Sequence, residues 1–357
     1  MIKITSRLQK IRCKLNENEI DAFLVSQPEN RYYLSGFDGS AGFLLITQEE
    51  SILATDFRYT EQAKGQAPDY EILQIKGEIA EWLPGLVTDL KLKSLGFEAG
   101  NLTFALYQKI SEALNKTQPH FKLMSLNGLV ESLRAIKEAG EIELIKKAVK
   151  IADAALGYIE EIIHAGMIEK DLAWEVEKFL RENGSDGMPF DIIVASGPNA
   201  ALPHAKPSAH AINAGEPVIV DLGARVGAYT SDMTRTFCVG RRDKTFDKIY
   251  KIVLDAQQEA MDKMKFEMTG GEVDSLARKV IEQAGYGEAF GHGLGHGVGL
   301  ATHEQPRLGP GSTDKIVNGI VFTVEPGIYL SGWGGVRIED VALMENDKIS
   351  VISKARK

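Results

Sequence analysis

Glycine occupies every second position from 291 to 299 in the segment GHGLGHGVGLATH (residues 291–303), which also holds three of the seven histidines. A helix is excluded, because each interior glycine would cost about 1 kcal/mol relative to alanine. No window fits the phosphate-binding patterns G-x-G-x-x-G or G-x-x-x-x-G-K. A period of two is typical of a strand, and it predicts that His292 and His296 lie on one face.

A first acidic hairpin is predicted in VIVDLGARVGAYTSDMTRTF, residues 218–237. Two strand-like segments flank Val226-Gly227, which has the composition of a two-residue hairpin turn. Symmetric pairing about that turn places Asp221 directly opposite Asp232. Opposed carboxylates are about 5 Å apart at Cβ and repel each other.

A second acidic hairpin is predicted in FTVEPGIYLSGWGGVRIEDVAL, residues 322–343. Its glycine-rich loop centres on Gly332, and Glu325 and Glu339 lie at equal separations on either side, so they are again opposed. Two pairs of carboxylates on buried strands are costly unless positive charge offsets them.

Arginines or metal ions could supply that positive charge. If arginines do, the two hairpins are ion-paired, with Arg235 and Arg337 as counter-ions. However, Arg235 points to the face opposite Asp232, and only Arg337 shares the face of Glu339. One arginine cannot balance four carboxylates, whereas two divalent cations can, with His296 as a nitrogen ligand. Oxygen-rich coordination with one imidazole suits Mn²⁺ or Co²⁺ better than a thiolate-rich structural zinc site, and it predicts a catalytic two-metal centre.

Composition narrows the class of protein. The chain of 357 residues has a net charge of −9, which argues against nucleic-acid binding because no basic surplus exists to neutralise phosphates. No apolar run reaches the roughly 18 residues that span a bilayer. The N-terminal MIKITSRLQKIRCKL lacks the apolar core of a signal peptide. With only two cysteines, both expected to be reduced, we predict a cytoplasmic protein.

The patterning predicts two domains. Residues 1–125 alternate helical and strand-like segments, which indicates an α/β domain. Residues 126–357 begin with a long amphipathic helix and contain an internal repeat, because LAWEV at Leu172 recurs as LARKV at Leu276, an offset of 104 residues. The same offset carries Asp221 onto Glu325. Two similar halves would therefore converge at their acids.

The five candidate ligands and their contexts resemble the pita-bread metallopeptidases, which include methionine aminopeptidases, aminopeptidase P and prolidase. SDMTRTF, GHGLGHGVGL, TVEPGIY and RIEDV match the proline-specific branch, and YYLSGFDGSAGFLLIT and ATDFRYTEQA resemble its creatinase-type N-terminal domain. The resemblance implies an α+β protein: a C-terminal pita-bread (creatinase/aminopeptidase) fold with a pseudo-twofold repeat after a smaller α/β domain. It also implies a homodimer.

The resemblance assigns roles to the metal ligands. Asp232 and Glu339 are expected to bridge two divalent ions, Asp221 to complete one site, and His296 with Glu325 to complete the other. A hydroxide between the ions is expected to attack the scissile carbonyl. Mn²⁺ is the preferred ion, with Co²⁺ and Zn²⁺ as alternatives.

It also assigns residues around the substrate. His204 and His303 are expected to hold the carbonyl oxygen and help protonate the leaving nitrogen. His292 is a candidate for substrate binding, with packing as an equal alternative. Arg307 is a candidate for binding a substrate carboxylate, with an exposed loop role as its alternative, and Arg337 is expected to orient Glu339.

The function expected from this resemblance is a dinuclear-metal exopeptidase that cleaves the bond before proline at the N-terminus of dipeptides or short peptides. The alternatives are a methionine aminopeptidase, against which the N-terminal domain argues, and a non-catalytic binding relative that has lost its metals. A creatinase-like amidinohydrolase is disfavoured because that enzyme lacks these ligands. Dipeptides and longer peptides remain open as substrates, with Arg307 favouring dipeptides.

Overall fold

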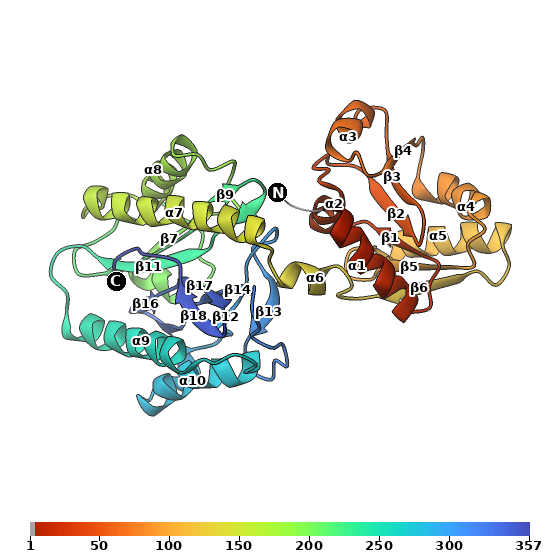
Figure 1. The fold of residues 1–357 in the computed structure, drawn as a ribbon. Coiled ribbons are helices and arrows are strands. Elements are labelled where there is room, and N and C mark those ends of the chain that lie inside the picture. The colour runs from red at the N-terminus through yellow and green to blue at the C-terminus, as the bar shows by residue number, and fades with distance from the viewer. Residues whose placement is uncertain (1–3) are drawn as a thin grey trace. The chain divides into compact units, whose positions relative to one another are not determined.

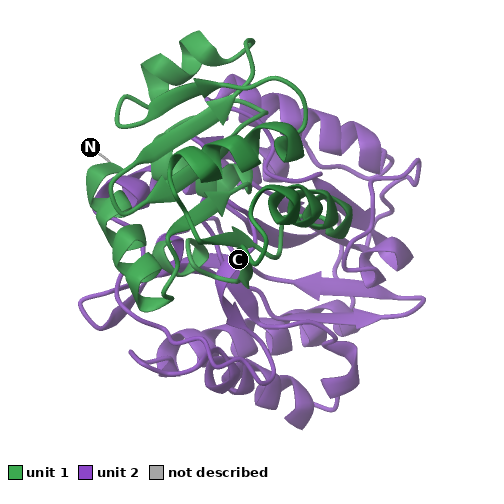
Figure 2. Cartoon of the chain, turned by 90° about the vertical axis from the view of Figure 1, so that its right-hand side faces the viewer, with its two compact units in different colours: residues 1–133 green, residues 134–357 purple. Residues whose placement is uncertain are grey.

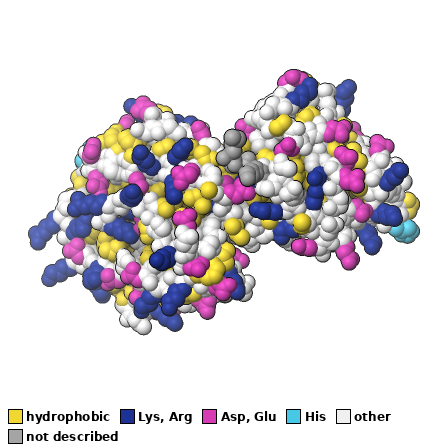
Figure 3. All heavy atoms as spheres, in the orientation of Figure 1, with side chains coloured by type: hydrophobic (Ala, Val, Ile, Leu, Met, Phe, Trp, Pro, Cys, Tyr) yellow, Lys and Arg dark blue, Asp and Glu magenta, His cyan; other side chains and the backbone are white. Residues whose placement is uncertain are grey.

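The computed structural model describes residues 4–357, and its packing divides the chain into two compact units, Met1–Leu133 and Arg134–Lys357 (Figure 2). The boundary between the two units, after Leu133, lies C-terminal to the domain boundary predicted near residue 125. No helix in residues 4–357 is both long and apolar enough to cross a membrane. Acidic and basic side chains are interspersed over the face shown in Figure 3.

The first unit contains a six-stranded mixed sheet in the order β4-β3-β2-β1-β5-β6 (Figure 1). Strand β1 pairs antiparallel with β2 and parallel with β5. The α/β patterning predicted for this region is therefore confirmed. The elements are α1 (Ile4–Glu17), β1 (Ala22–Val25), α2 (Pro28–Ser35), β2 (Phe43–Thr47), β3 (Ser51–Thr55), α3 (Thr60–Gln66), β4 (Glu71–Gln74), α4 (Ile79–Asp89), β5 (Ser94–Glu98), α5 (Phe104–Thr117) and β6 (Lys122–Leu126).

The second unit places helices α7 and α8 on one side of its strands and α9 and α10 on the other (Figure 1). A three-stranded sheet, β11-β8-β7, and a five-stranded sheet, β13-β12-β14-β17-β18, lie between them. The helical elements are α7 (Ala139–Ile162), α8 (Glu169–Glu182), η1 (Gly197–Ala201), α9 (Lys244–Lys263), α10 (Gly270–Gln283) and η2 (Gly287–Ala289). The strands are β7 (Ile193–Ser196), β8 (Pro217–Leu222), β9 (Arg225–Val226), β10 (Tyr229–Thr230), β11 (Met233–Cys238), β12 (Gly295–Gly297), β13 (Glu304–Leu308), β14 (Val321–Val324), β15 (Gly327–Leu330), β16 (Gly334–Arg337), β17 (Asp340–Glu345) and β18 (Lys348–Val351).

The long helix predicted at the start of the second unit is divided in two. A short helix, α6 (Glu131–Ala135), precedes α7, which begins after a capping box formed by Glu138 and Glu141. The capping box satisfies backbone donors at the start of α7, so the helix has a defined first turn. The apolar face predicted from Ile142, Ile145 and Val149 is buried.

The predicted register of the first acidic hairpin is wrong by two residues. Asp221 pairs with Thr234, not with Asp232, and the turn residues are Gly227 and Ala228. Both turn residues have positive φ, 55° and 70°, as a type I′ turn requires. A shift of two residues preserves the side-chain face, because strand side chains alternate with period two. The two acids therefore still converge diagonally.

The predicted register of the second acidic hairpin is confirmed. Val324 pairs with Asp340 on one side of the acids, and Gly327 pairs with Arg337 on the other. Glu325 and Glu339 occupy the break between these two ladders, where β14 ends and β17 begins. Their side chains are therefore brought together by a hairpin whose regular pairing is interrupted at the acids.

The glycine-rich strand is shorter than predicted. Only residues 295–297 form β12, so His292 lies before the strand and does not share it with His296. The glycines are required by close packing, since a Cβ at Gly295 would clash with the carbonyl oxygen of Thr323 and one at Gly297 would clash with that of Gln305. The alternation thus lets neighbouring strands approach β12 closely on both edges.

Candidate metal centre

Four carboxylates and a histidine gather in the second unit. Three overlapping groups of ligand atoms each lie within 4.8 Å: Asp221, Asp232 and Glu339; His296, Glu325 and Glu339; and Asp232, His296 and His303. The first acid comes from β8, the second precedes β11, and the other two flank β14 and β17. All five residues predicted as ligands are therefore brought together, and His303 lies beside them.

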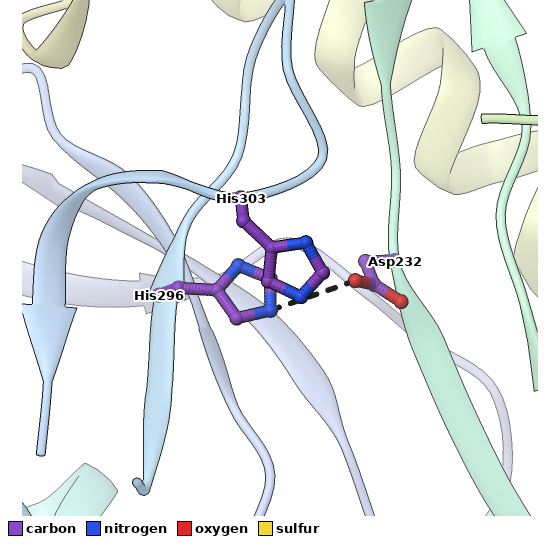
Figure 4. Close-up of side chains that lie close together, drawn as sticks. All are labelled: Asp232, His296 and His303. Atoms are coloured by element: carbon purple, nitrogen blue, oxygen red, sulfur yellow. Dashed lines mark ion pairs between the residues drawn. The ribbon is translucent and has the colours of Figure 1, made fainter. Parts of the chain in front are cut away.

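His296 faces the acids. Its Nε2 lies 3.2 Å from Oε1 of Glu325 and 3.6 Å from Oδ2 of Asp232. The ring of His303 lies beside it with a centroid separation of 4.0 Å, and both rings point toward Asp232 (Figure 4). Because β12 and the loop after it carry these two rings, the glycine-rich segment supplies the nitrogen side of the centre.

The acids lack sufficient positive charge from the protein. Burial, and then the charges of neighbouring carboxylates, raise the pKa values of both Asp232 and Glu339 well above the ordinary range. Oδ1 of Asp221 and Oε1 of Glu339 are buried and make no hydrogen bond in residues 4–357. Buried oxygens of this kind are costly without a partner. This donor set of carboxylate oxygens and one imidazole nitrogen fits divalent cations.

Glu325 and His296 form a close pair within the cluster. Burial alone would raise the pKa of Glu325, but the hydrogen bond and charge of His296 outweigh it and hold that pKa at about 2. Burial would likewise lower the pKa of His296, but the contact with Glu325 raises it. Thr323 steadies both residues, because its hydroxyl accepts from the His296 amide and donates to the Glu325 carboxylate.

Arg337 does not contact the carboxylate predicted for it. Its Nη2 donates to Oδ2 of Asp221 at 2.6 Å, and no hydrogen bond joins it to Glu339 within the described chain. It reaches Glu339 only through Thr234, whose hydroxyl accepts from Arg337 Nε and donates to Oε2 of Glu339 at 2.7 Å. The guanidinium holds Asp221 directly, because β16 lies beside β8, and its predicted role in orienting Glu339 stays a prediction that depends on the link through Thr234.

Arg235 belongs to a different network. It is buried and forms an ion pair of 2.7 Å with Asp340, and it also donates to the carbonyl oxygens of Ala355 and Arg356. Its side chain thus lies away from the ligand carboxylates, as the strand period predicted. Only Arg337, of the two candidate counter-ions, contacts a ligand carboxylate.

His292 is held by Tyr329, which sequence reasoning missed. Nε2 of His292 lies 2.9 Å from the Tyr329 hydroxyl, which also accepts from Arg337 Nη1 at 2.9 Å. The other ring nitrogen lies 2.8 Å from the carbonyl oxygen of Gly293. His292 belongs to none of the three ligand groups. Tyr329 has the same strand parity as Glu325, and that signal could have identified it.

His204 and Arg307 are exposed and differently placed. His204 follows η1 in a loop, and burial is the main cause that lowers the pKa values of the half-buried His292 and of His303. Arg307 lies on β13 directly opposite His296 in the strand pairing. Its guanidinium makes no ion pair or hydrogen bond with residues 4–357. Both side chains are exposed to solvent.

Comparison with known proteins identifies the family of this chain. The model of metallopeptidase family M24 matches residues 143–346, and that of the creatinase/prolidase N-terminal domain matches residues 7–136. The Xaa-Pro dipeptidase of Pyrococcus furiosus is 38% identical over 98% of each chain. The solved structure of an Xaa-Pro dipeptidase from Bacillus anthracis is 41% identical with a TM-score of 0.95, and the prolidase from Pyrococcus horikoshii is 36% identical with a TM-score of 0.92, each over 99% of both chains. The chain therefore belongs to metallopeptidase family M24, and it is a metallo-exopeptidase whose pita-bread domain follows a creatinase/prolidase N-terminal domain.

Proposed function

We propose that this protein hydrolyses the Xaa-Pro bond at the N-terminus of dipeptides or short peptides, with two divalent metal ions. The observation that carries the proposal is the convergence of four carboxylates and one imidazole. Two of the buried carboxylate oxygens have no hydrogen-bond partner among residues 4–357. The proline specificity is supported by relatives and solved structures that are named Xaa-Pro dipeptidase or prolidase.

The proposed ligands divide between the two ions as the family resemblance implies. Asp232 and Glu339 would be shared, Asp221 would hold one ion, and His296 with Glu325 would hold the other. When bound, the ions would polarise the scissile carbonyl and lower the pKa of an attacking water. Mn²⁺ is the ion we propose, with Co²⁺ and Zn²⁺ as alternatives.

The chain's own polar groups would then orient these ligands. Arg337 restrains Asp221, and Thr234 restrains Glu339, each by a hydrogen bond to one carboxylate oxygen, which leaves the other oxygen without a partner among residues 4–357. Thr323 restrains Glu325 and the backbone of His296. Partners of this kind fix ligand geometry and tune metal affinity.

The histidines around the ligands are proposed to act on the substrate. His303 lies next to His296, and burial, followed by the charge of His296, lowers its pKa. An imidazole N–H can donate a hydrogen bond to the substrate's carbonyl oxygen, and an imidazole that has taken up a proton can pass it to the leaving nitrogen. We assign His303 and His204 to these tasks. His292, held between Tyr329 and Gly293, would shape the wall of the substrate site.

Proline fits this chemistry for a physical reason. The amide nitrogen of an Xaa-Pro bond carries no hydrogen. A peptidase that must accept a hydrogen bond from that N–H group therefore cannot use an Xaa-Pro substrate. Metal ions that hold the carbonyl oxygen do not need the missing hydrogen. Arg307 would select dipeptides by binding the carboxylate of the proline, since its free guanidinium lies opposite His296.

The test is hydrolysis of Ala-Pro, Ala-Pro-Ala and Met-Ala after removal of metal by a chelator and reloading with Mn²⁺, Co²⁺ or Zn²⁺. We expect turnover of at least one proline peptide only after reloading, with two ions bound per chain by elemental analysis. Hydrolysis of Met-Ala alone would favour a methionine aminopeptidase instead. No turnover with any ion, or no bound metal, would overturn the proposal.

We also propose a homodimer, as the family resemblance implies, and a cytoplasmic location, as the composition predicts. Sedimentation analysis of the purified full chain would test the assembly. A species with the mass of one chain, 39.1 kDa, across the tested concentrations would contradict it.

A further inference from the structure

The carboxylate of Glu169, the first residue of α8, is fully buried and saturated with hydrogen bonds. Its Oε1 accepts from the amide and the hydroxyl of Ser196 at 2.7 and 2.9 Å. Its Oε2 accepts from the amide and the hydroxyl of Ser208 at 2.9 and 2.7 Å. Asn199 also donates to it. Such bonds to a charged acceptor are strong and expensive to leave unmade.

These bonds join the two ends of one segment. Ser196 ends β7, and Ser208 lies beyond η1, so Glu169 ties the beginning and the end of residues 196–208 to α8. The helix backbone reinforces the second end, because the amides of Glu169 and Lys170 donate to the carbonyl oxygens of His210 and Ser208. Between its ends the segment forms short-range turns, and Ala200 and Ala205 pack against Ala195 and Ile219, so Glu169 is the polar attachment of its two ends.

The segment held by Glu169 carries His204. The residue before it, Pro203, offers its carbonyl oxygen to Arg337 Nη1 at 3.3 Å, and Arg337 in turn holds the ligand Asp221. His204 itself is exposed, and its ring makes no hydrogen bond in the described chain. The position of His204 relative to the acids is therefore determined by the backbone of residues 196–208 and not by contacts of its own ring.

The other half of the unit uses the same device. Asp274 on α10 forms an ion pair of 2.7 Å with Arg278, and its Oδ1 accepts from the amide of Leu294 at 3.0 Å. Arg278 donates to the carbonyl oxygens of Phe290 and His292. Helices α8 and α10 carry LAWEV and LARKV, the two matching sequences of the predicted internal repeat. Each copy thus attaches one histidine-bearing segment to a buried acid on its helix.

We propose that Glu169 is a positioning residue for catalysis: it holds residues 196–208 so that His204 meets the substrate at the metal centre. This inference rests on the proposed function. A carboxylate is required, because each of its two oxygens must accept a hydrogen bond from a backbone N–H group. In a Glu169→Gln variant the amide nitrogen would face one of those donors, and one end of the segment would be released.

The first measurement needs no substrate. Hydrogen–deuterium exchange of peptides from residues 197–207 is compared between the wild type, Glu169→Gln and the control Glu98→Gln. Glu98 is a matched control, because it is a buried carboxylate in the first unit that accepts from the Ser26 and Gln27 amides and from Asn30. We expect faster exchange in 197–207 for Glu169→Gln only, with unchanged metal content.

The second measurement is a double-mutant cycle on Xaa-Pro hydrolysis. Glu169→Gln should lower kcat/KM by about tenfold or more in the wild-type background. In a His204→Ala background the same substitution should change it less than about twofold, because the residue that Glu169 positions is gone. If Glu169→Gln does not fold, Ser208→Ala replaces it in the cycle. This substitution removes one hydroxyl donor to Glu169 but keeps the backbone donor, so we expect a smaller fall in kcat/KM.

The outcomes separate the two proposals. If the wild type does not hydrolyse Xaa-Pro peptides, the proposed function fails, whatever the exchange data show. If the wild type is active but the loss from Glu169→Gln or Ser208→Ala is equal with and without His204, or exchange in 197–207 is unchanged, the positioning role is overturned. The positioning role of Glu169 is supported if kcat/KM falls only in proteins that keep His204. The control Glu98→Gln must show no such fall.

Discussion

Arg337 donates from Nη2 to Oδ2 of Asp221 across 2.6 Å, and this bond joins the two acidic hairpins of the second unit. Asp221 lies on β8 of the first half, whereas Arg337 lies on β16 of the second. The same guanidinium bonds Thr234 and Tyr329, so one buried side chain restrains residues from both halves. Three directed bonds require the planar fork of arginine.

Replacing Arg337 with lysine should weaken metal binding while retaining the charge. A lysine ammonium cannot reproduce the three bonds, so Asp221 loses its fixed orientation. We expect affinity for Mn²⁺ to fall roughly 10–100-fold, measured by calorimetric titration of the metal-free protein. The exposed Arg241→Lys serves as the control. Equal affinities for wild type and Arg337→Lys would show that this contact does not organise the centre.

A single methyl group at Gly295 should disrupt the site. A Cβ there would clash with the carbonyl oxygen of Thr323, so β12 would have to move away from β14 and carry His296 with it. We expect Gly295→Ala to lower the free energy of unfolding by about 1–3 kcal/mol and to reduce bound metal. Gly291→Ala is the matched control, since a Cβ at Gly291 meets nothing within 4 Å. Similar losses in both variants would contradict this explanation of the glycine alternation.

A buried ion cluster next to His303 should make stability depend on pH. Glu304 contacts Arg134 at 2.5 Å and Lys137 at 2.7 Å, and all three side chains are almost fully buried. Burial alone would raise the pKa of Glu304, but the charges of Lys137 and Arg134 outweigh it and lower that pKa. Because the folded-state pKa lies below the unfolded one, this stabilisation is fully present above the ordinary value of 4.5 and is lost as pH falls below it.

Glu304→Gln tests this cluster directly. It leaves two buried cations without their anion, so at neutral pH it should cost about 3–5 kcal/mol of unfolding free energy in urea titrations. The difference from wild type should shrink as pH falls below the ordinary value of 4.5, because the carboxylate is protonated first in the unfolded state and only at lower pH in the folded state. Glu288→Gln, at an exposed site, should show neither effect. A pH-independent difference would refute the linkage.

Strand period and residue order were sufficient to predict which residues converge. The register of Asp221 was wrong by two residues because a turn at Gly227 and Ala228, with positive φ at an alanine, is not the turn that composition favours. The error left the metal site intact, since an even shift keeps side chains on the same face. Glu325 and Glu339 were paired correctly, because their hairpin is symmetric about Gly332.

Contacts between the two halves could not be predicted in the same way. Arg337 was expected to orient Glu339 because both lie on one strand face, yet it bonds Asp221, which is distant in sequence. Tyr329 and Glu169 act through partners that only tertiary packing brings near. Local periodicity determines the face of a side chain, but the packing of one half against the other determines which groups meet across it.

Arg307 should control the choice between dipeptides and longer peptides. Its guanidinium is exposed, has no partner in residues 4–357, and lies opposite His296 in the strand pairing. In Ala-Pro the free carboxylate follows the scissile bond closely, whereas in Ala-Pro-Ala it is displaced by one residue. Arg307→Ala should therefore raise KM for Ala-Pro by roughly tenfold, with a smaller change for Ala-Pro-Ala. Arg307→Lys should restore part of the binding, because the charge remains without the bidentate fork. Parallel changes in KM for both peptides, or none for either, would assign Arg307 to the exposed surface of β13 and not to the substrate site.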